Sequence, residues 1–316
     1  MGRFKFNHIK PIMVETAKRW MRAEPFRQSA TISYYAIFSI PGLLIIVIWA
    51  AGIFFGQEAV QGEISNQIGT MMGEETAESV EDLISNAYIS STGWVMKAIG
   101  IIALVFGATT LFFQLQKSLN FLWDVEPDPE NNLKKMIIDR ASSFGLILVI
   151  AFLLLISLVL SSILSILSNW IAGRFGEEIY YLTEIVDFLL SFGIITLLFA
   201  IMYKFLPDVE IGWKSVWVGA MVTAFLFTLG KTLLGLYFGM ADPTSGFGAA
   251  GTIILVMVWV NYTCLILFFG AEFTHVFAKN YGHQIQPSEH AKWTAAYLHR
   301  KEEGEHEDPI ESRTRE

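Results

Sequence analysis

The fold is decided by two apolar runs, WKSVWVGAMVTAFLFTLGKTLLGLYF at residues 213–238 and TIILVMVWVNYTCLILFFGAEFTHVFA at residues 252–278. Each is longer than the ~20 apolar residues that a helix needs to cross a bilayer. The short segment 239–251 joins them, so we expect a hairpin of two membrane helices. Each run also contains one ionisable residue, Lys231 in the first and Glu272 in the second. A charge at such depth usually faces a bundle interior or a wet cavity rather than lipid.

The composition of the whole chain agrees with a membrane protein. Of its 316 residues, 53% are hydrophobic and only 16% are charged, whereas about a quarter of the residues of a soluble domain are charged. The single cysteine, Cys264, lies inside an apolar run, so no disulfide framework is expected within one chain. The first apolar run begins too late and is too long for a cleaved signal peptide, so we expect it to remain as a membrane helix.

Four further apolar runs precede the hairpin, at residues 37–55, 95–115, 144–167 and 186–203. We therefore predict an all-α, polytopic membrane protein, with a bundle of six transmembrane helices over residues 37–278. Pro41-Gly42 interrupts the first run and predicts a break or hinge, because proline removes one backbone donor and bends a helix. Pro207, in Leu206-Pro207-Asp208, predicts a second break, between the fourth and fifth spans.

The segments outside the spans differ in charge. Residues 1–36 carry seven basic side chains and no long apolar run. Their apolar residues recur near helical spacing, which predicts a basic amphipathic helix on the anionic inner leaflet; a solvated leader is the alternative. The helix would turn Ile12, Met13, Thr16, Trp20 and Ala23 to one side and Lys18, Arg19 and Arg22 largely to the other.

The loop at residues 56–93 is acidic and is expected on the external side. It has seven acids and no lysine or arginine, and its apolar residues predict two short amphipathic helices on either side of Gly73. These helices would cap the outer face of the bundle. The polar tail at residues 279–316 is expected to be cytoplasmic and largely disordered, with one short helix near residues 290–298.

Basic residues predict the orientation of the six spans. The N-terminal segment, loop 116–140, loop 204–214 and the tail hold seven, four, two and six basic residues, whereas the three opposite loops together hold only Arg174. Positive charge is concentrated on the cytoplasmic side of membrane proteins. We therefore predict a multi-pass protein whose N-terminus and C-terminus are both cytoplasmic.

The two intramembrane charges lie on faces that turn inward. Lys231 is seven residues after Ala224, within about 20° of the small-residue face of its helix. Glu272 is eleven residues after Asn261, so the two side chains point within about 20° of the same direction from their helix. His275 follows Glu272 by one turn. These residues, Lys231, Asn261, Glu272 and His275, are candidates for a buried polar group or a transport path.

A direct bridge between Lys231 and Glu272 is not expected. Because the two helices run in opposite directions, the side chains lie in opposite leaflets, about 20 Å apart along the membrane normal. We predict separate partners for them. Two structural alternatives stay open: Lys231 extends to the outer interface, and a nearby cytoplasmic arginine or lysine caps Glu272.

Two other groups of residues are candidates with a plain structural alternative. Tyr34 and Tyr35 place polar-tipped rings where the chain enters the membrane, a position that an aromatic belt also explains. The loop at residues 242–251, with Gly248 and Gly251, permits a re-entrant turn or a tight connection. It is no phosphate-binding loop, because it lacks the closing Gly-Lys-Ser/Thr.

No catalytic, metal or cofactor site is predicted. Only His275 of the six histidines lies near a span, and the sequence has no zinc-protease motif and no nucleophile elbow. The basic inner face does not require a nucleic acid as partner, because the predicted orientation already explains it. We expect membrane lipids as partners, no soluble partner is evident, and Gly235-x-x-x-Gly239 offers a helix contact within or between chains, hence a possible homo-oligomer.

The chain resembles the YihY/BrkB family of bacterial inner-membrane proteins over roughly residues 10–280. The matching segments are SYYAIFSIP at 33–41, YKFLPD at 203–208, Gly219-Ala220…Thr223-Ala224…Lys231, GAAG at 248–251 and GAEF at 270–273. The resemblance implies a six-helix inner-membrane protein linked to envelope integrity and serum resistance, with candidate lipid exporters or flippases among its members. A ribonuclease BN label has also been attached to the family, but this sequence lacks a carboxylate or histidine cluster for a nuclease metal.

Three functions follow as hypotheses. The first is a transporter or flippase for a lipid-like amphiphile, working at the interface of the first, fifth and sixth spans. The second is a structural or assembly protein of the envelope that transports nothing, in which the buried charges specify helix packing. An intramembrane enzyme is the third.

Overall fold

The computed structural model describes residues 9–87, 94–128, 178–241, 249–281 and 285–302, together with Gly145 and Val149. The predicted third span, at 144–167, and Gly248 lie outside the described residues, apart from those two positions. The helices are α1 (Ile9–Arg22), α2 (Pro25–Phe55), α3 (Gln57–Met72), α4 (Glu74–Ala87), α5 (Trp94–Leu122), α7 (Glu178–Phe205), α8 (Trp213–Ala241), α9 (Ala249–Tyr281) and α10 (Ala295–Glu302). The strands are β1 (Val125–Pro127), β2 (Val209–Glu210), β3 (Gln286–Pro287) and β4 (Ala291–Trp293).

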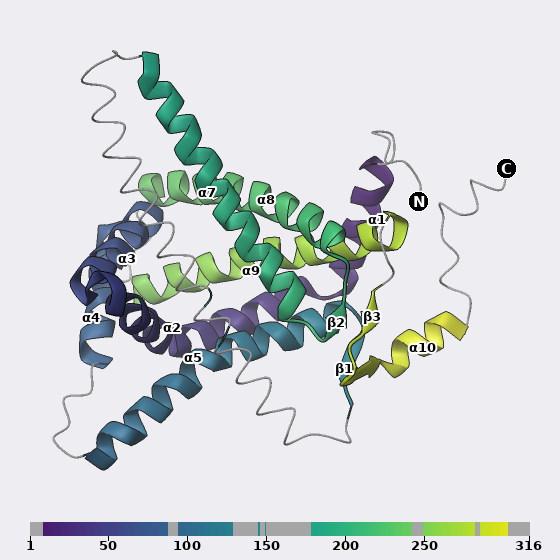
Figure 1. The fold of residues 1–316 in the computed structure, drawn as a ribbon, viewed down its shortest axis with the longest axis horizontal. Coiled ribbons are helices and arrows are strands. Elements are labelled where there is room, and N and C mark those ends of the chain that lie inside the picture. The colour runs from purple at the N-terminus through teal and green to yellow at the C-terminus, as the bar shows by residue number, and fades with distance from the viewer. Residues whose placement is uncertain are drawn as a thin grey trace.

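The long helices form a bundle in which α2 and α9 are central. Helix α2 packs against α5 and α9, helix α9 also packs against α8 and α1, and α7 packs against α8 (Figure 1). In the described part of the chain, four helices are long and apolar enough to cross a membrane, over Pro25–Phe54, Phe188–Phe205, Trp213–Tyr237 and Gly251–Tyr281. They coincide with the predicted first, fourth, fifth and sixth spans, and α5 is a helix over the second. The protein is therefore a mostly helical, multi-pass membrane protein.

The first span differs from its prediction at both the start and the middle. Helix α2 begins at Pro25, not at residue 37, with proline in the first turn, where its missing N–H costs nothing. Glu24 precedes it in the left-handed region, with φ 48°. The helix also continues through Pro41 and Gly42, so the predicted break does not interrupt it. A helix in lipid has no other partners for its backbone groups, which favours continuing past one lost hydrogen bond.

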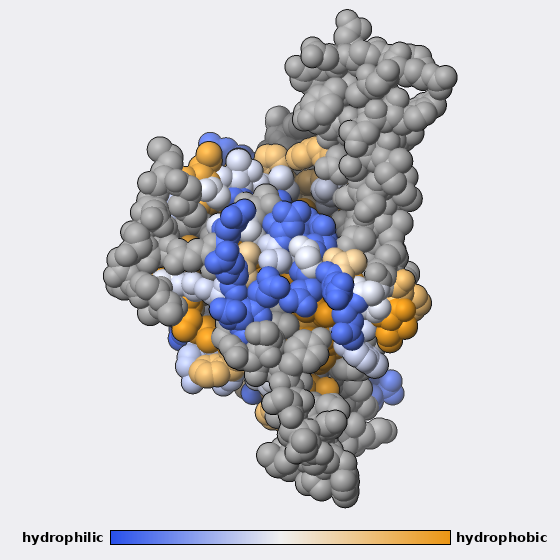
Figure 2. All heavy atoms as spheres, turned by 90° about the vertical axis from the view of Figure 1, so that its left-hand side faces the viewer, coloured by the Kyte–Doolittle hydropathy of each residue, from blue (hydrophilic) through white to orange (hydrophobic). Residues whose placement is uncertain are grey.

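Helices α3 and α4 cap one end of the bundle, as the periodicity of residues 56–93 predicted. Gly73 separates them with φ 92°, a conformation that side chains other than glycine rarely adopt. Val60 and Val80 are buried against Ile48 and Ala51 of α2. Figure 2 looks onto this end of the molecule, where hydrophilic side chains gather. Exposed acids among them are Glu58, Glu74, Glu78, Glu81 and Asp82.

The C-terminal segment is more ordered than its composition indicated. Strand β3 pairs with β2, and β4 pairs with β1, in two antiparallel two-stranded sheets. The N–H of Ser288 donates to the Asp208 carbonyl at 3.0 Å and that of Thr294 to the Asp124 carbonyl at 2.9 Å. The fold is therefore not purely α-helical, and the expected disorder is wrong for residues 285–302. The predicted short helix lies later, at Ala295–Glu302, because residues 291–293 form a strand.

Candidate functional site

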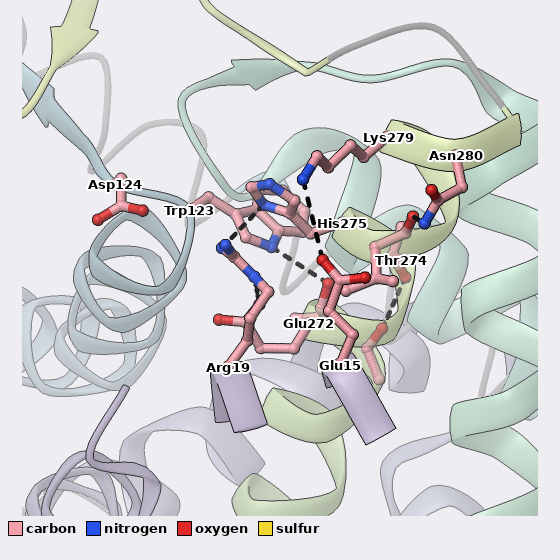
Figure 3. Close-up of polar contacts among 12 residues, drawn as sticks. Glu15, Arg19, Trp123, Asp124, Glu272, Thr274, His275, Lys279 and Asn280 are labelled. Carbon is pink, nitrogen blue, oxygen red and sulfur yellow. Dashed lines mark hydrogen bonds and ion pairs between the residues drawn. The ribbon is translucent and has the colours of Figure 1, made fainter. Parts of the chain in front are cut away.

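The candidate site is an ion pair between α1 and α9. Arg19 of α1 donates from Nε to Oε2 of Glu272 on α9 at 2.8 Å (Figure 3). The Glu272 side chain is only 1% exposed and that of Arg19 is 22% exposed. Burying two charges costs several kcal/mol per ion, which good geometry offsets only in part. The pair therefore requires α1 to be held firmly against α9.

An apolar contact supplies that hold. Ile12 of α1 is buried against Phe273, Val276 and Phe277 of α9, and Thr16 is fully buried one turn later. Ile12, Thr16 and Arg19 follow the spacing i, i+4, i+7, which places them along one face of a helix. The prediction that Arg19 lies on the side of this helix opposite Ile12 and Thr16 is thus wrong, and its side chain turns into the bundle.

Two further polar contacts extend the ion pair along the α1–α9 interface. Arg19 Nη2 lies 3.5 Å from Nδ1 of His275, and Lys279 Nζ lies 3.9 Å from Oε1 of Glu15. An arginine can only donate, so Nδ1 of His275 acts as acceptor in this contact. Burial lowers the pKa of Arg19, but the Glu272 carboxylate outweighs it and leaves that pKa above its ordinary value. Arg19 is therefore charged at every physiological pH.

The prediction that Glu272 has a partner other than Lys231 is confirmed by these contacts. Within the described residues, the one hydrogen bond and ion pair of Glu272 is with Arg19, which also confirms the alternative in which a basic residue outside the spans caps it. Lys231 lies half-buried on α8. Asn261, predicted on the Glu272 face, donates from Nδ2 to Oγ of Ser29 on α2 at 3.1 Å. The face of α9 that carries Asn261 and Glu272 is thus turned toward α1 and the start of α2.

The remaining candidates occupy less central places. Tyr34 is 56% exposed, and its ring lies 5.6 Å from Tyr35 and 5.2 Å from Phe38, so it belongs to the outside of the bundle rather than to a buried polar group. Pro207 follows the end of α7 at Phe205, where a break was predicted. Gly251 lies inside the first turn of α9 rather than in the preceding connection.

A second polar cluster joins the end of α5 to the turn after α7, and Trp123, which follows α5, bonds to α9. Asp208 accepts from Nδ2 of Asn120 at 2.7 Å and from Nε2 of Gln116 at 3.3 Å, and the Asp208 N–H donates to Oδ1 of Asn120 at 2.8 Å. Trp123 Nε1 donates to the Ala271 carbonyl at 3.2 Å, directly beside Glu272. The sequence showed Asp208 only as part of a helix break, because its partners lie 88 and 92 residues away.

Helices α8 and α9 make a close, reciprocal contact. A Cβ on Gly219 would lie 1.7 Å from Oγ1 of Thr274, and one on Gly270 would lie 1.8 Å from Oγ1 of Thr223. Each threonine donates to the glycine carbonyl of its own helix, at 2.8 Å for Thr223 and 2.7 Å for Thr274. The close approach that small residues on α8 predicted is therefore present. At Gly235, an added Cβ would meet no atom of the described residues.

The groups brought together here are suited to charge pairing and hydrogen bonding. Over the ranges that the structure describes, no group of three or more histidine, cysteine, aspartate or glutamate residues is placed to hold a metal ion. Sequence reasoning named Glu272, Asn261 and His275 but missed the partners Arg19 and Ser29. The helical spacing of Arg19 from Ile12 and Thr16 was the available signal for the first of them.

Comparison with known proteins places the chain among membrane proteins. It is 27% identical over 252 residues to a UPF0761 membrane protein of Pseudoalteromonas atlantica, covering 78% of each chain. With a relative from Mannheimia succiniciproducens the identity is 23% over 284 residues, covering 87% of this chain and 92% of the relative. With one from Verminephrobacter eiseniae it is 24% over 233 residues, covering 72% of this chain but only about half, 52%, of the relative.

No solved structure matches the chain. The family described as "Virulence factor BrkB" matches residues 16–294, which include α2, α5, α7, α8, α9 and both two-stranded sheets. Since this match covers most of the sequence, the chain belongs to the BrkB virulence-factor family.

Proposed function

We propose that this protein moves a lipid-like amphiphile across the bacterial inner membrane and so supports envelope integrity. The observation that carries the proposal is the polar line on α9, in which the buried Glu272 and the partly buried Asn261 and His275 face α1 and α2. Ionisable residues inside membrane helices are rare and typically mark substrate or ion pathways. The path follows this side of α9, because the other side is closed by the Gly–Thr contacts with α8.

Arg19 is the group that recognises the headgroup in this mechanism. A guanidinium binds phosphate and carboxylate through two parallel hydrogen bonds, and Arg19 already holds a carboxylate. An anionic headgroup that enters between α1 and α9 competes with Glu272 for Arg19. The apolar tails stay in the bilayer, beside the exposed apolar side chains of the bundle.

The direct test uses purified protein in liposomes that contain fluorescent phospholipids. We expect transfer between leaflets above that of protein-free vesicles, and loss of the transfer in Arg19→Gln and Glu272→Gln. Lys214→Gln is the matched control, because Lys214 is exposed and distant in sequence from the ion pair. Folded wild-type protein that transfers no lipid faster than empty vesicles do would refute the proposal.

A second candidate function is structural: an envelope assembly protein that transports nothing. Two observations favour it. Arg19 and Glu272 neutralise each other within the chain, so neither needs a ligand, and the contact between α8 and α9 is tight. Under this hypothesis, Glu272→Gln changes the stability of the protein. The wild type and every variant then transfer lipid between leaflets only as fast as protein-free vesicles do.

Our proposal includes six spans with both termini in the cytoplasm. In support, α1, β1, β2 and the C-terminal segment lie at one end of the bundle, and the acidic α3 and α4 lie at the other (Figure 1). The basic end is the one that the positive-inside rule assigns to the cytoplasm.

Cysteine labelling in whole cells checks this orientation. With the buried Cys264 replaced by serine, a membrane-impermeant maleimide is expected to label Glu58→Cys on α3 in intact cells. Lys301→Cys on α10 is expected to react only after the cells are permeabilised. Both positions are exposed, so access depends on the side of the membrane. The reverse pattern would overturn the orientation.

A further inference from the structure

Three carboxylates act on the charge of Arg19: Glu272, Asp124 and, most weakly, Glu15 one turn earlier on α1. Arg19 is bonded to one of them. Its bond is with Glu272, whereas Asp124, in the turn after α5, acts on it as a second nearby negative charge. Figure 3 shows the Arg19 guanidinium between Glu272 on one side and Asp124 on the other. Glu272 belongs to α9 and Asp124 to the turn after α5, so the choice of Arg19 between these two carboxylates decides what α1 is attached to.

Both Arg19 and Asp124 have unused hydrogen-bonding capacity. Among the described residues, Arg19 bonds through Nε and Nη2 only, which leaves Nη1 without a partner. Asp124 Oδ1 accepts from Nη2 of Arg300, on α10, at 2.6 Å, and the other oxygen of this carboxylate bonds to none of the described residues. A bond between the two is therefore chemically available and is not made.

Burial explains why Arg19 is bonded to Glu272. Removing one partner of a buried pair costs about 3–5 kcal/mol, and the Glu272 side chain is 1% exposed. Asp124 is 19% exposed, so water stabilises its charge in part, and Arg300 neutralises it further. Without Arg300, the negative charge of Asp124 would act on Arg19 uncompensated, and the preference for Glu272 would weaken.

Helix α10 lies on the surface of the protein. None of its residues is buried, and Arg300 itself is 43% exposed. Besides the Arg300–Asp124 pair, its contacts include the Thr294 N–H bond to the Asp124 carbonyl, just before the helix, and the stacking of Tyr297 on Trp293 at 4.2 Å. Segments with few buried contacts open at low free energy.

We propose that α10 is a latch that controls the docking of α1 on α9. While Arg300 holds Asp124, Arg19 stays on Glu272 and α1 is closed over the end of α9. When α10 detaches, Asp124 draws Arg19 away and α1 loosens. This inference concerns the attachment of α1 and holds whether or not the bundle carries a lipid.

Hydrogen–deuterium exchange of the full-length protein in nanodiscs tests the latch. In Arg300→Ala we expect the amides of α1 to exchange roughly tenfold faster than in the wild type, a typical size for coupling between two sites. In the double variant Arg300→Ala/Asp124→Asn the exchange of α1 is expected to return to the wild-type rate, because the competing charge is gone. Asparagine accepts the positive φ of residue 124, 57°, so the turn is preserved.

The controls separate the latch from a simple anchor. Lys301→Ala, on the same helix and exposed, should leave α1 unchanged. If Arg300 only anchors α10, the exchange of α10 rises in both Arg300 variants and that of α1 in neither, which refutes the latch. Asp124→Asn alone is an independent check that does not require Arg300→Ala to fold: α1 should exchange no faster than in the wild type, and faster exchange would overturn the proposal.

Discussion

Arg19→Ala is expected to lower the free energy of unfolding by about 3–5 kcal/mol, the usual loss when one partner of a buried ion pair is removed. The substitution leaves Glu272, 1% exposed, without the guanidinium that the structure places 2.8 Å away. The measurement is the thermal or denaturant-induced unfolding of purified protein in detergent. The loss should appear as a large drop in the melting temperature, with α1 the first segment to lose protection.

Removing both charges should recover most of this loss. In Arg19→Met/Glu272→Met no charge remains buried, and methionine fills similar space with an apolar side chain. Arg22→Ala is the matched control on the same helix, because Arg22 is exposed, and it should stay within about 0.5 kcal/mol of the wild type. If Arg19→Ala lowered the free energy of unfolding no more than Arg22→Ala does, the ion pair would not stabilise the fold.

Gly219→Ala is expected to destabilise the bundle by about 3 kcal/mol or more, at the upper end for an overpacked site. The added Cβ would lie 1.7 Å from Oγ1 and 2.8 Å from Cβ of Thr274, so α8 and α9 must separate to admit it. In a membrane, such small-residue contacts are a main source of helix association. Unfolding in detergent and the yield of folded protein both report the effect.

The complementary substitution should restore this contact. Thr274→Gly removes both clashing atoms and leaves the Thr274 Cα, at 3.3 Å, as the nearest neighbour of the new methyl group. The double variant Gly219→Ala/Thr274→Gly should therefore recover most of the stability, because the new methyl group on α8 occupies the space that the Thr274 side chain leaves on α9. Gly235→Ala is the control, where a Cβ meets none of the described residues. A loss there equal to that at Gly219 would show that helix–helix contact is not the cause.

Local periodicity and charge were sufficient for much of this fold. The apolar runs at 213–238 and 252–278 became α8 and α9, and the i, i+4 pattern around Gly73 became α3 and α4. The eleven-residue spacing of Asn261 and Glu272 placed both on the face toward α1 and α2. These features depend on residues within one helix, so a single sequence contains them.

The errors arose where partners are far apart in sequence. Residues 25–36 are polar enough to be taken for part of a cytoplasmic leader, yet they form the start of α2. There Ser29 accepts a hydrogen bond from Asn261, a residue 232 positions away. The tail beyond residue 279 has a composition typical of disorder, yet its two- and three-residue strands pair with β1 and β2. Strands that short produce no alternating pattern from which to predict them.

Sequence alone determined that this chain is a helical membrane protein with a charged residue in each arm of its last hairpin, because lipid imposes length and apolarity on every span. It also excluded a bridge between Lys231 and Glu272, from the opposite directions of the two helices. Only the tertiary structure decided that Arg19 is the partner of Glu272 and that Asp124 and Arg300 stand beside this pair. An ion pair between residues 253 positions apart depends on how α1 docks on α9, and that docking follows from packing across the whole bundle rather than from any local pattern.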